Sequence, residues 1–286
     1  MTEALAVVGL TKRYPEFLLD GVNITIPTGY VMGFVGPNGA GKTTTLKAIL
    51  GIVKPDAGVV RLFGGPAGAA AVNQRVGVVM DNPYYPEGWT ARDVGEMAGL
   101  FYERWSAPGF ARQLDQFGIS ATKKISELSR GMRVKLQLAV ALSHGADLLV
   151  LDEPTSGLDP VARDELRNML HDFVADEAHT VLFSTHITQD LERTADYITL
   201  LFDGRVVFSG ELEALSNSYL RVSGDVDRLT PADRADIIGY RARGGVFEGM
   251  VPADKAAALP PDLLTEAVTI DEIVVYLSQA KEPSHV

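Results

Sequence analysis

Short runs of Val, Ile and Leu alternate with segments of helical periodicity along most of the chain, and this pattern predicts a sheet covered by helices. The apolar runs predict strands at 30–35, 59–63, 76–80, 148–151, 180–184, 197–202 and 205–208. Helical periodicity predicts helices at 42–52, 161–174 and 189–194. The order of these elements indicates an α/β fold.

The strand pattern stops between residues 81 and 145, where three helices are expected at 90–101, 108–117 and 130–144. Beyond residue 217 the pattern loosens, prolines interrupt it, and one further apolar helix is expected at 270–277. We therefore expect a main domain at 1–216 that contains a helical subdomain at about 81–145. A small accessory domain is expected to follow at 217–286.

Composition excludes several classes of protein. The 286 residues are 46% hydrophobic, which is enough for a large core and argues against intrinsic disorder. The absence of cysteine excludes disulfides, thiol nucleophiles and cysteine-based zinc sites. The start shows no signal-peptide pattern, and no apolar run reaches about 18 residues. We expect a cytoplasmic protein without a membrane span.

The charge balance bears on the partners of the protein. Its 37 acidic residues outnumber its 26 Lys and Arg residues and give a formal net charge of −11 at pH 7. A surface of this sign repels nucleic-acid phosphates and anionic lipid headgroups. We therefore expect no nucleic-acid partner and no direct insertion into lipid.

A glycine-rich segment follows the first predicted buried strand. Residues 36–43 read GPNGAGKT, which satisfies the pattern G-x-x-x-x-G-K-[ST]. Glycines let backbone N–H groups point at phosphate oxygens, the Lys42 ammonium neutralises phosphate charge, and the Thr43 hydroxyl is suited to Mg²⁺. The alternative is a tight strand-to-helix turn that uses glycine for geometry alone. The flanking strand and helix favour a phosphate site.

Two adjacent acids end a second apolar strand, in the segment LLVLDE at 148–153. Ligands of open α/β sheets bind at the carboxyl ends of the strands, beside a phosphate loop of this kind. Asp152 can hold Mg²⁺ there, and Glu153 can orient or deprotonate an attacking water. The alternative is a pair of solvated acids before the turn at Pro154. Together with the glycine-rich loop, the pair favours a hydrolytic site.

Three further motifs follow the glycine-rich loop: LSRGM at 128–132, before the acid pair, and SGLD at 156–159 and STH at 184–186, after it. In this order and spacing, the motifs resemble those of the ATP-binding cassette (ABC) ATPases, the subunits that drive ABC transporters. The resemblance covers about residues 4–215. It implies a P-loop core of mixed β-sheet flanked by helices, with an inserted helical subdomain.

The resemblance also implies a role for each matching residue. Tyr14 matches the aromatic that stacks on adenine, and Glu153, His186 and Lys42 match the catalytic groups. The expected nucleotide-binding residues are Gly36, Asn38, Gly39, Ala40, Gly41, Lys42, Thr43 and Thr44 of the Walker A loop, Ser129 and Gly131 of the signature motif, and Asp159 of the D-loop. Taken alone, Tyr14 is typical of a packed surface aromatic and His186 of a capping or core histidine.

The sequence departs from the family pattern at two motifs. Asp81 stands where a glutamine that touches Mg²⁺ is usual, and we expect it to keep the metal role together with Thr43 and Asp152. A loop shifted by one residue would give this role to Asn82 instead. In the signature motif, Arg130 replaces the usual glycine and Met132 the usual glutamine.

As the resemblance implies, we expect an ATPase that binds ATP and Mg²⁺ and pairs with a second ATP-binding subunit. It would drive a separate transmembrane permease at the inner face of the cell membrane. Residues 269–273 resemble the closing helix of some ABC-2-type exporter ATPases, which favours an exporter. The alternatives are a soluble ABC-type ATPase acting on the ribosome or nucleic acid, and a nucleotide-binding module without turnover.

The helical subdomain is the expected docking surface for the permease. Its candidate anchors are Tyr84, Tyr85, Trp89 and Phe101, because large aromatic side chains dominate protein interfaces. The alternative for each of them is packing inside the subdomain. For the tail, three alternatives stay open: it closes over the dimer, binds a regulator or only extends the fold.

Overall fold

The computed structural model describes residues 2–81 and 85–280, and its centre is a six-stranded sheet in the order β10-β9-β3-β8-β7-β6. The strands are β3 (Val31–Val35), β6 (Val76–Val79), β7 (Leu148–Asp152), β8 (Thr180–Thr185), β9 (Tyr197–Phe202) and β10 (Arg205–Glu211). All pairs are parallel except that of β10 with β9. Every residue of β3, β7 and β8 is buried, which explains the apolar runs that make up most of their sequences.

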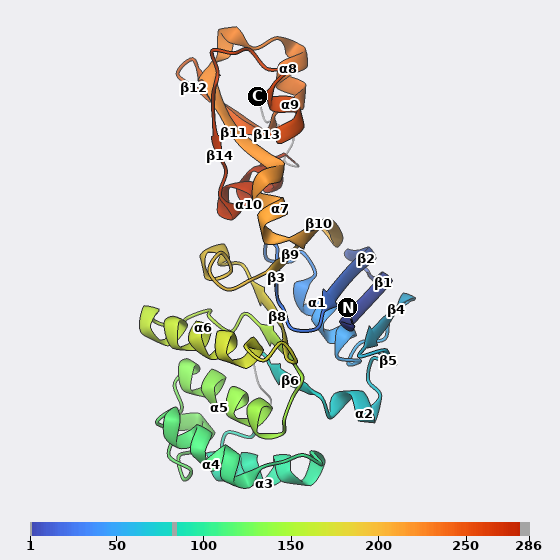
Figure 1. Ribbon diagram of the computed structural model, residues 1–286, viewed down its shortest axis with the longest axis vertical. Coiled ribbons are helices and arrows are strands. Elements are labelled where there is room, and N and C mark those ends of the chain that lie inside the picture. Colours follow the sequence, from blue (N-terminus) through green and yellow to red (C-terminus); the bar gives the residue numbers. More distant parts are fainter. Residues whose placement is uncertain (1, 82–84, 281–286) are drawn as a thin grey trace.

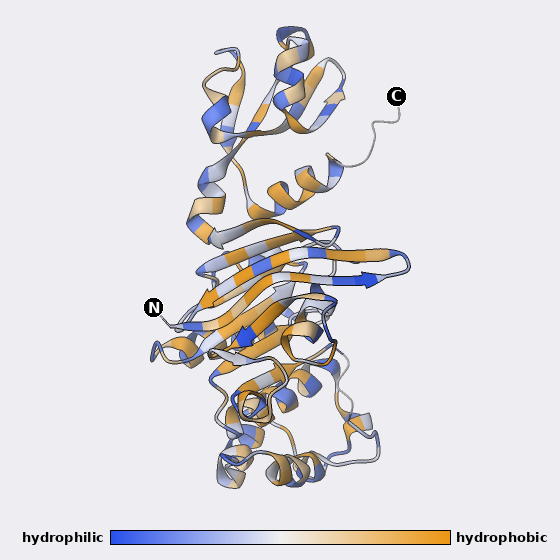
Figure 2. Cartoon of the chain, turned by 90° about the vertical axis from the view of Figure 1, so that its right-hand side faces the viewer, coloured by the Kyte–Doolittle hydropathy of each residue, from blue (hydrophilic) through white to orange (hydrophobic). Residues whose placement is uncertain are grey.

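A second, antiparallel sheet covers one face of this centre (Figures 1 and 2). Its order is β2-β1-β4-β5, with β1 (Glu3–Tyr14), β2 (Phe17–Pro27), β4 (Ala57–Leu62) and β5 (Gly65–Pro66). Helix α1 (Lys42–Ile49) contributes Leu46 and Ile49 to the apolar cluster that joins the two sheets. The predicted strand 59–63 therefore lies in the antiparallel sheet.

Helices α6 (Pro160–Val174) and α5 (Arg130–Ser143) lie next to the central sheet, and α3 (Ala91–Phe101) and α4 (Ala107–Gln116) lie beyond α5 (Figure 1). The 3₁₀ turn η1 (Ile125–Glu127) precedes α5. The short α2 (Ala70–Asn73) precedes β6. In the described part of the segment 81–145, the one β interaction is an isolated bridge between Thr90 and Lys124. A small apolar core of its own joins α3, α4 and α5.

Two helix predictions need correction. The helix expected at 189–194 is wrong, because the chain forms only the 3₁₀ turn η2 (Thr188–Asp190) followed by turns. Leu191 is fully buried beside Gly33 of β3, so the chain must turn sharply before it enters β9. The helix expected at 42–52 ends at Ile49, because Gly51 adopts a left-handed φ of +72°.

The C-terminal part contains a third sheet that the sequence pattern did not predict. Its order is β12-β13-β11-β14, with β11 (Tyr219–Asp225), β12 (Ile238–Arg243), β13 (Val246–Pro252) and β14 (Leu264–Ala267). The helical pieces around it are α7 (Leu212–Ser218), η3 (Val226–Arg228), α8 (Pro231–Asp236) and α9 (Ala253–Ala256). This sheet has its own small core, formed by residues such as Phe247 and Val251.

The last helix, α10 (Ile270–Gln279), lies between this third sheet and the rest of the protein (Figures 1 and 2). Its side chains Ile270, Ile273 and Tyr276 are buried in the same apolar cluster as the central strands. The expected boundary at residue 216 falls inside α7. The C-terminal part therefore shares a core with the central sheet as well as having one of its own.

The first prediction concerns His144, which follows α5 and is 1% exposed. Its ring stacks on that of Tyr102 at 3.9 Å, and burial lowers the pKa of His144 to about 4. The neutral form is thus favoured in the folded state, so stability should be lost as the pH falls from about 6.5 towards 4. We expect this single group to account for about 2 kcal/mol of unfolding free energy between about pH 8 and pH 5.

Urea unfolding of the parent and of His144→Phe, measured at several pH values, checks this expectation. Phe keeps a ring against Tyr102 but cannot take up a proton, so the variant should lose that part of the pH dependence. His171→Gln, at an exposed histidine of α6, is the control and should leave the pH dependence unchanged. Parallel pH curves for His144→Phe and the parent would contradict the prediction.

Candidate nucleotide-binding and catalytic site

The glycine-rich loop connects β3 to α1 at the carboxyl edge of the central sheet. A Cβ on Gly36 would lie 2.2 Å from the carbonyl oxygen of Leu201. Gly41 has a φ of +106°, and a Cβ there would lie 2.6 Å from Phe17 Cζ. Gly36 has no room for a side chain beside the β9 backbone, and Gly41 combines a left-handed backbone with close contact to the Phe17 side chain. The packing around the loop therefore favours glycine at both positions.

Lys42 is the first residue of α1 and is 6% exposed. Its Nζ donates a hydrogen bond to Gly36 O at 2.7 Å and lies 3.4 Å from Pro37 O and from Glu153 Oε1. A buried ammonium is unfavourable without oxygen partners, and these three oxygens provide them. The positive charge is thus held between the loop and the acid that follows β7, where it can meet an incoming phosphate.

Asp152, the last residue of β7, joins that strand to the loop helix. Its carboxylate accepts hydrogen bonds from Thr43 Oγ1 at 2.9 Å and from Ser184 Oγ at 3.1 Å. Burial raises the pKa of Asp152, while the Thr43 and Ser184 hydrogen bonds oppose this effect. A carboxylate beside a hydroxyl forms the hard oxygen pair that Mg²⁺ prefers, so these two side chains fit the expected metal.

Glu153 has a left-handed backbone with φ of +51°, which is unusual for a residue with a side chain. Its N–H donates to Ser184 O at 2.9 Å, and its Oε2 lies 2.6 Å from His186 Nδ1. A carboxylate only accepts, so Nδ1 donates in this pair. Lys42, Glu153 and His186 therefore form one chain of contacts across the ends of β3, β7 and β8.

The other predicted residues of the loop and of the adenine side lie around this centre. Ala40 is buried, and its carbonyl accepts a hydrogen bond from Gly204 N at 3.0 Å, whereas Asn38 and Gly39 are exposed. Thr44 is half-buried on α1. Tyr14 ends β1, is 40% exposed, and pairs across the hairpin with Phe17, which packs on Gly41. The hairpin therefore brings Tyr14 to the loop side of the protein.

The signature and D-loop residues have structural roles at helix starts. Ser129 caps α5 by accepting from Met132 N at 3.3 Å, and Asp159 caps α6 by accepting from Val161 N and Ala162 N at 2.9 and 3.0 Å. Gly131 faces Leu158, whose Cδ2 would lie 3.2 Å from a Cβ there. Among the described hydrogen bonds and ion pairs, none joins Ser129, Gly131 or Asp159 to Lys42 or to Glu153.

The two departures from the family pattern meet each other. The Arg130 guanidinium forms an ion pair with the carboxylate of Asp81, so the predicted metal ligand is held by the signature motif. The rival candidate, Asn82, lies outside the described residues. In residues 2–81 and 85–280, no three His, Asp or Glu side chains gather as a metal cluster. The metal role of Asp81 therefore stays a prediction.

The sequence analysis did not identify Gln137, which links the signature helix α5 to the segment just before Asp81. This α5 residue is 4% exposed, accepts from Met80 N at 2.9 Å and donates to Met80 O at 3.1 Å. It therefore holds the backbone just before Asp81 against the signature helix. The sequence signal that could have identified Gln137 is an amide side chain among apolar neighbours at a buried helical position.

A glycine-rich loop between a buried strand and a helix, with an aspartate at the end of a nearby parallel strand, defines a P-loop nucleotide-binding protein. Comparison with known proteins shows which family of P-loop proteins the chain belongs to. The family model described as ABC transporter matches residues 19–156. An ABC transporter ATP-binding protein of Nostoc sp. is 38% identical over 212 residues, which are 70% of this chain but only 62% of that protein.

The Nod factor export ATP-binding protein I of Burkholderia lata is 38% identical over 217 residues, which are 73% of this chain and 71% of that protein. A solved ATP-binding subunit of an ABC transporter superposes with a TM-score of 0.68 at 27% identity, covering 74% of this chain and 91% of that one. The chain therefore belongs to the ATP-binding proteins of ABC transporters, with the α/β P-loop fold that its motifs predicted. In the part of the chain that the structure describes, no helix has both the length and the apolar character needed to span a membrane.

The second prediction concerns Lys42. Lys42→Ala removes the buried ammonium and leaves the carboxylate of Glu153 without its cationic partner. We expect ATP affinity to fall about 10- to 100-fold, the range for a lost charge-assisted contact. Titration with a fluorescent ATP analogue measures this change. Lys47→Ala, in the same helix, is the matched control, and equal affinities of the two variants would contradict the prediction.

Proposed function

We propose that this chain is the MgATP-hydrolysing subunit of an exporter-type ABC transporter. The observation that carries the proposal is the line of contacts from Lys42 through Glu153 to His186 at one edge of the central sheet. It combines a phosphate-binding cation, a carboxylate base and an imidazole within hydrogen-bonding reach of one another. Such a set suits attack of water on a terminal phosphate.

Each group has a distinct part in that reaction. Glu153 orients and deprotonates the attacking water, and His186 holds the γ-phosphate through its exposed edge. Lys42 exchanges its contact with Glu153 for phosphate oxygens when ATP enters the loop. Mg²⁺, held by Thr43 and Asp152, would neutralise charge on the β- and γ-phosphates. Asn38, Gly39, Ala40 and Thr44 complete the phosphate loop, and Tyr14 stacks on adenine.

The active form is a dimer with a second ATP-binding subunit of the same kind. Ser129 and Gly131 start a helix whose N-terminal end favours an anion, yet they make no described contact with the phosphate loop of their own chain. They serve the ATP of the partner, and Asp159 lies beside them at the start of α6. A two-fold axis then produces two complete sites from two chains.

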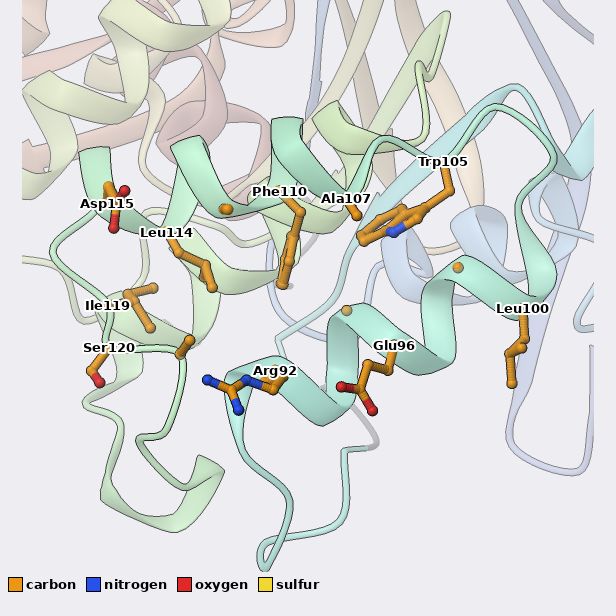
Figure 3. A pocket seen from close by; sticks show the side chains of 14 residues that line it. Arg92, Glu96, Leu100, Trp105, Ala107, Phe110, Leu114, Asp115, Ile119 and Ser120 are labelled. Atoms are coloured by element: carbon orange, nitrogen blue, oxygen red, sulfur yellow. The ribbon is translucent and has the colours of Figure 1, made fainter.

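A transmembrane permease docks on the helical subdomain. A groove of about 750 Å³ runs between α3 and α4 and is lined by apolar side chains that include Leu100, Trp105 and Leu114, with Arg92, Glu96 and Asp115 at its polar edge (Figure 3). An amphipathic helix of the permease fits such a groove. This contact would hold the subunit at the cytoplasmic face of the membrane.

The predicted aromatic anchors divide into two groups. Tyr85 and Trp89 pack against the core of the helical subdomain, and burial raises the pKa of Tyr85 to about 12. Phe101 is 66% exposed at the end of α3, beside Leu100 at 80%. Tyr84 lies outside the described residues. Phe101 and Leu100 are therefore the anchors that we propose, and the Nod factor export relative supports export as the direction of transport.

The third prediction tests the base. Glu153→Gln keeps the size of the side chain but cannot take a proton from water, so turnover should fall about 100- to 1,000-fold while ATP still binds. Phosphate release measures turnover, and light scattering with MgATP should show accumulated dimer. Glu192→Gln, at an exposed position in the turns between η2 and β9, is the control. Turnover of Glu153→Gln at the parent rate would refute the mechanism.

The fourth prediction tests the groove. Leu100→Glu places a charge on the exposed apolar rim and should cut co-purification of the permease from detergent-solubilised membranes about tenfold or more. The isolated variant should keep its ATP affinity, because the groove is remote from the phosphate loop. Leu264→Glu, at the 57% exposed leucine of β14, is the matched control. Equal permease recovery with both variants would place the docking surface elsewhere.

A further inference from the structure

The C-terminal part of the chain contacts the catalytic edge close to His186. Thr188 lies two residues after His186 and starts the 3₁₀ turn η2, where it is 1% exposed. Its hydroxyl donates a hydrogen bond to the carboxylate of Asp271, which belongs to the first turn of α10. Residues 83 positions apart are thereby joined directly behind the histidine of the site.

Hydrogen bonds on both sides hold the backbone from His186 to Thr188, so these two residues cannot easily move independently of each other. Ile187 N donates to Thr185 Oγ1 at 2.9 Å, and Leu191 N donates to Thr188 O at 2.9 Å. Leu191 itself is fully buried in the core. The backbone of His186 is held on its other side by Glu153, whose Oε2 accepts from His186 N at 3.3 Å. A displacement of Thr188 would therefore be passed to His186 through two peptide units.

Helix α10 holds Asp271 in a fixed position, because the helix is itself capped, ion-paired and tightly packed. Thr269 caps the helix by accepting from Glu272 N at 3.2 Å, and Glu272 in turn accepts from Thr269 N at 2.9 Å. The Glu272 carboxylate also pairs with Arg221 of β11 at 3.3 Å. One turn further along α10, on the same face, Tyr276 packs so closely on β12 that a Cβ at Gly239 would lie 2.8 Å from Tyr276 Cα. The position of Asp271 thus follows the position of the third sheet.

We propose that Asp271 is a positioning residue for His186, through which the C-terminal part of the chain controls ATP turnover. This inference deepens the proposed ATPase function and rests on it. When Asp271 holds Thr188, the imidazole of His186 stays aligned with Glu153 and with the place of the γ-phosphate. A movement of the third sheet would release Thr188 and lower the rate of hydrolysis without touching the phosphate loop.

The inference predicts a specific kinetic change. Asp271→Ala and Thr188→Val each remove the hydrogen bond and should lower kcat about tenfold, the scale for one hydrogen bond to a charged group. KM for MgATP and the affinity for a fluorescent ATP analogue should stay within about twofold of the parent, because Lys42, Asp152 and the loop are untouched. The double variant should be no slower than either single variant, because both changes delete the same bond.

Conservative variants separate positioning from simple stability. Asp271→Asn keeps an oxygen acceptor and Thr188→Ser keeps the hydroxyl, so both should retain most of the parent kcat. The matched control is Asp254→Ala, because Asp254 is an exposed aspartate in the first turn of α9 in the same part of the chain. It should have no effect on kcat. Thermal unfolding midpoints of the full-length variants show whether each is folded at the assay temperature.

The experiment is phosphate release by the full-length chain over a range of MgATP concentrations. A tenfold loss of kcat in Asp271→Ala and Thr188→Val, with rescue by Asn and Ser, supports the inference. Parent-like kcat in folded Asp271→Ala and Thr188→Val overturns the inference alone and leaves the proposed function standing. Loss of ATP affinity together with kcat also overturns it. A parent chain that binds ATP but releases no phosphate contradicts the proposed function itself.

Discussion

The arrangement of the strand ends at the candidate site depends on one buried charge, the ammonium of Lys42. Lys42 is almost fully shielded from water, so the protein must supply oxygens on every side of its charge. Gly36 provides a carbonyl from the loop, and Glu153 provides a carboxylate from the end of β7. This arrangement requires the ends of β3 and β7 to lie at the same level, with β8 between them. An ATP phosphate can replace the carboxylate at this place, because it offers the same negative oxygens.

The register of the central sheet meets that requirement. Val35 pairs with Thr185, and Asp152 pairs with Ser184, so the three parallel strands end together. Each strand then supplies a functional residue directly after its last pair. Ser184 uses both its carbonyl and its hydroxyl to fix the pair Asp152 and Glu153, which explains how Glu153 keeps a left-handed backbone. The strain at Glu153 is thus held in place by the neighbouring strand.

The parts of the fold and of the site that have a clear local sequence pattern could be predicted from the sequence. The strands of the central sheet, the loop and the helices of the segment 81–145 could be predicted, because buried parallel strands read as unbroken apolar runs and helices carry caps such as Thr90. The third sheet could not, because most residues of β11, β12 and β14 are only partly buried or exposed, so these strands lack an unbroken apolar run. The turns at residues 189–194 were predicted as a helix, since periodicity does not reveal the tertiary burial of Leu191. The pairs Arg130 with Asp81 and Thr188 with Asp271 join residues far apart in the chain, and no local pattern contains them.

These two long-range pairs share one physical consequence. Asp81 is attached through Arg130 to α5, and the backbone before it is attached through Gln137 to the same helix. Thr188 is attached through Asp271 to α10. The catalytic edge therefore has a rigid centre, built on β3, β7 and β8, and two connections to parts of the chain that pack at its periphery. The first connection belongs to the helical subdomain and ends at Asp81, and the second belongs to the C-terminal part and ends two residues after His186. Because the strands β3, β7 and β8 are themselves buried, these peripheral contacts are the places where the two outer parts of the chain meet the edge, and they meet it at different groups.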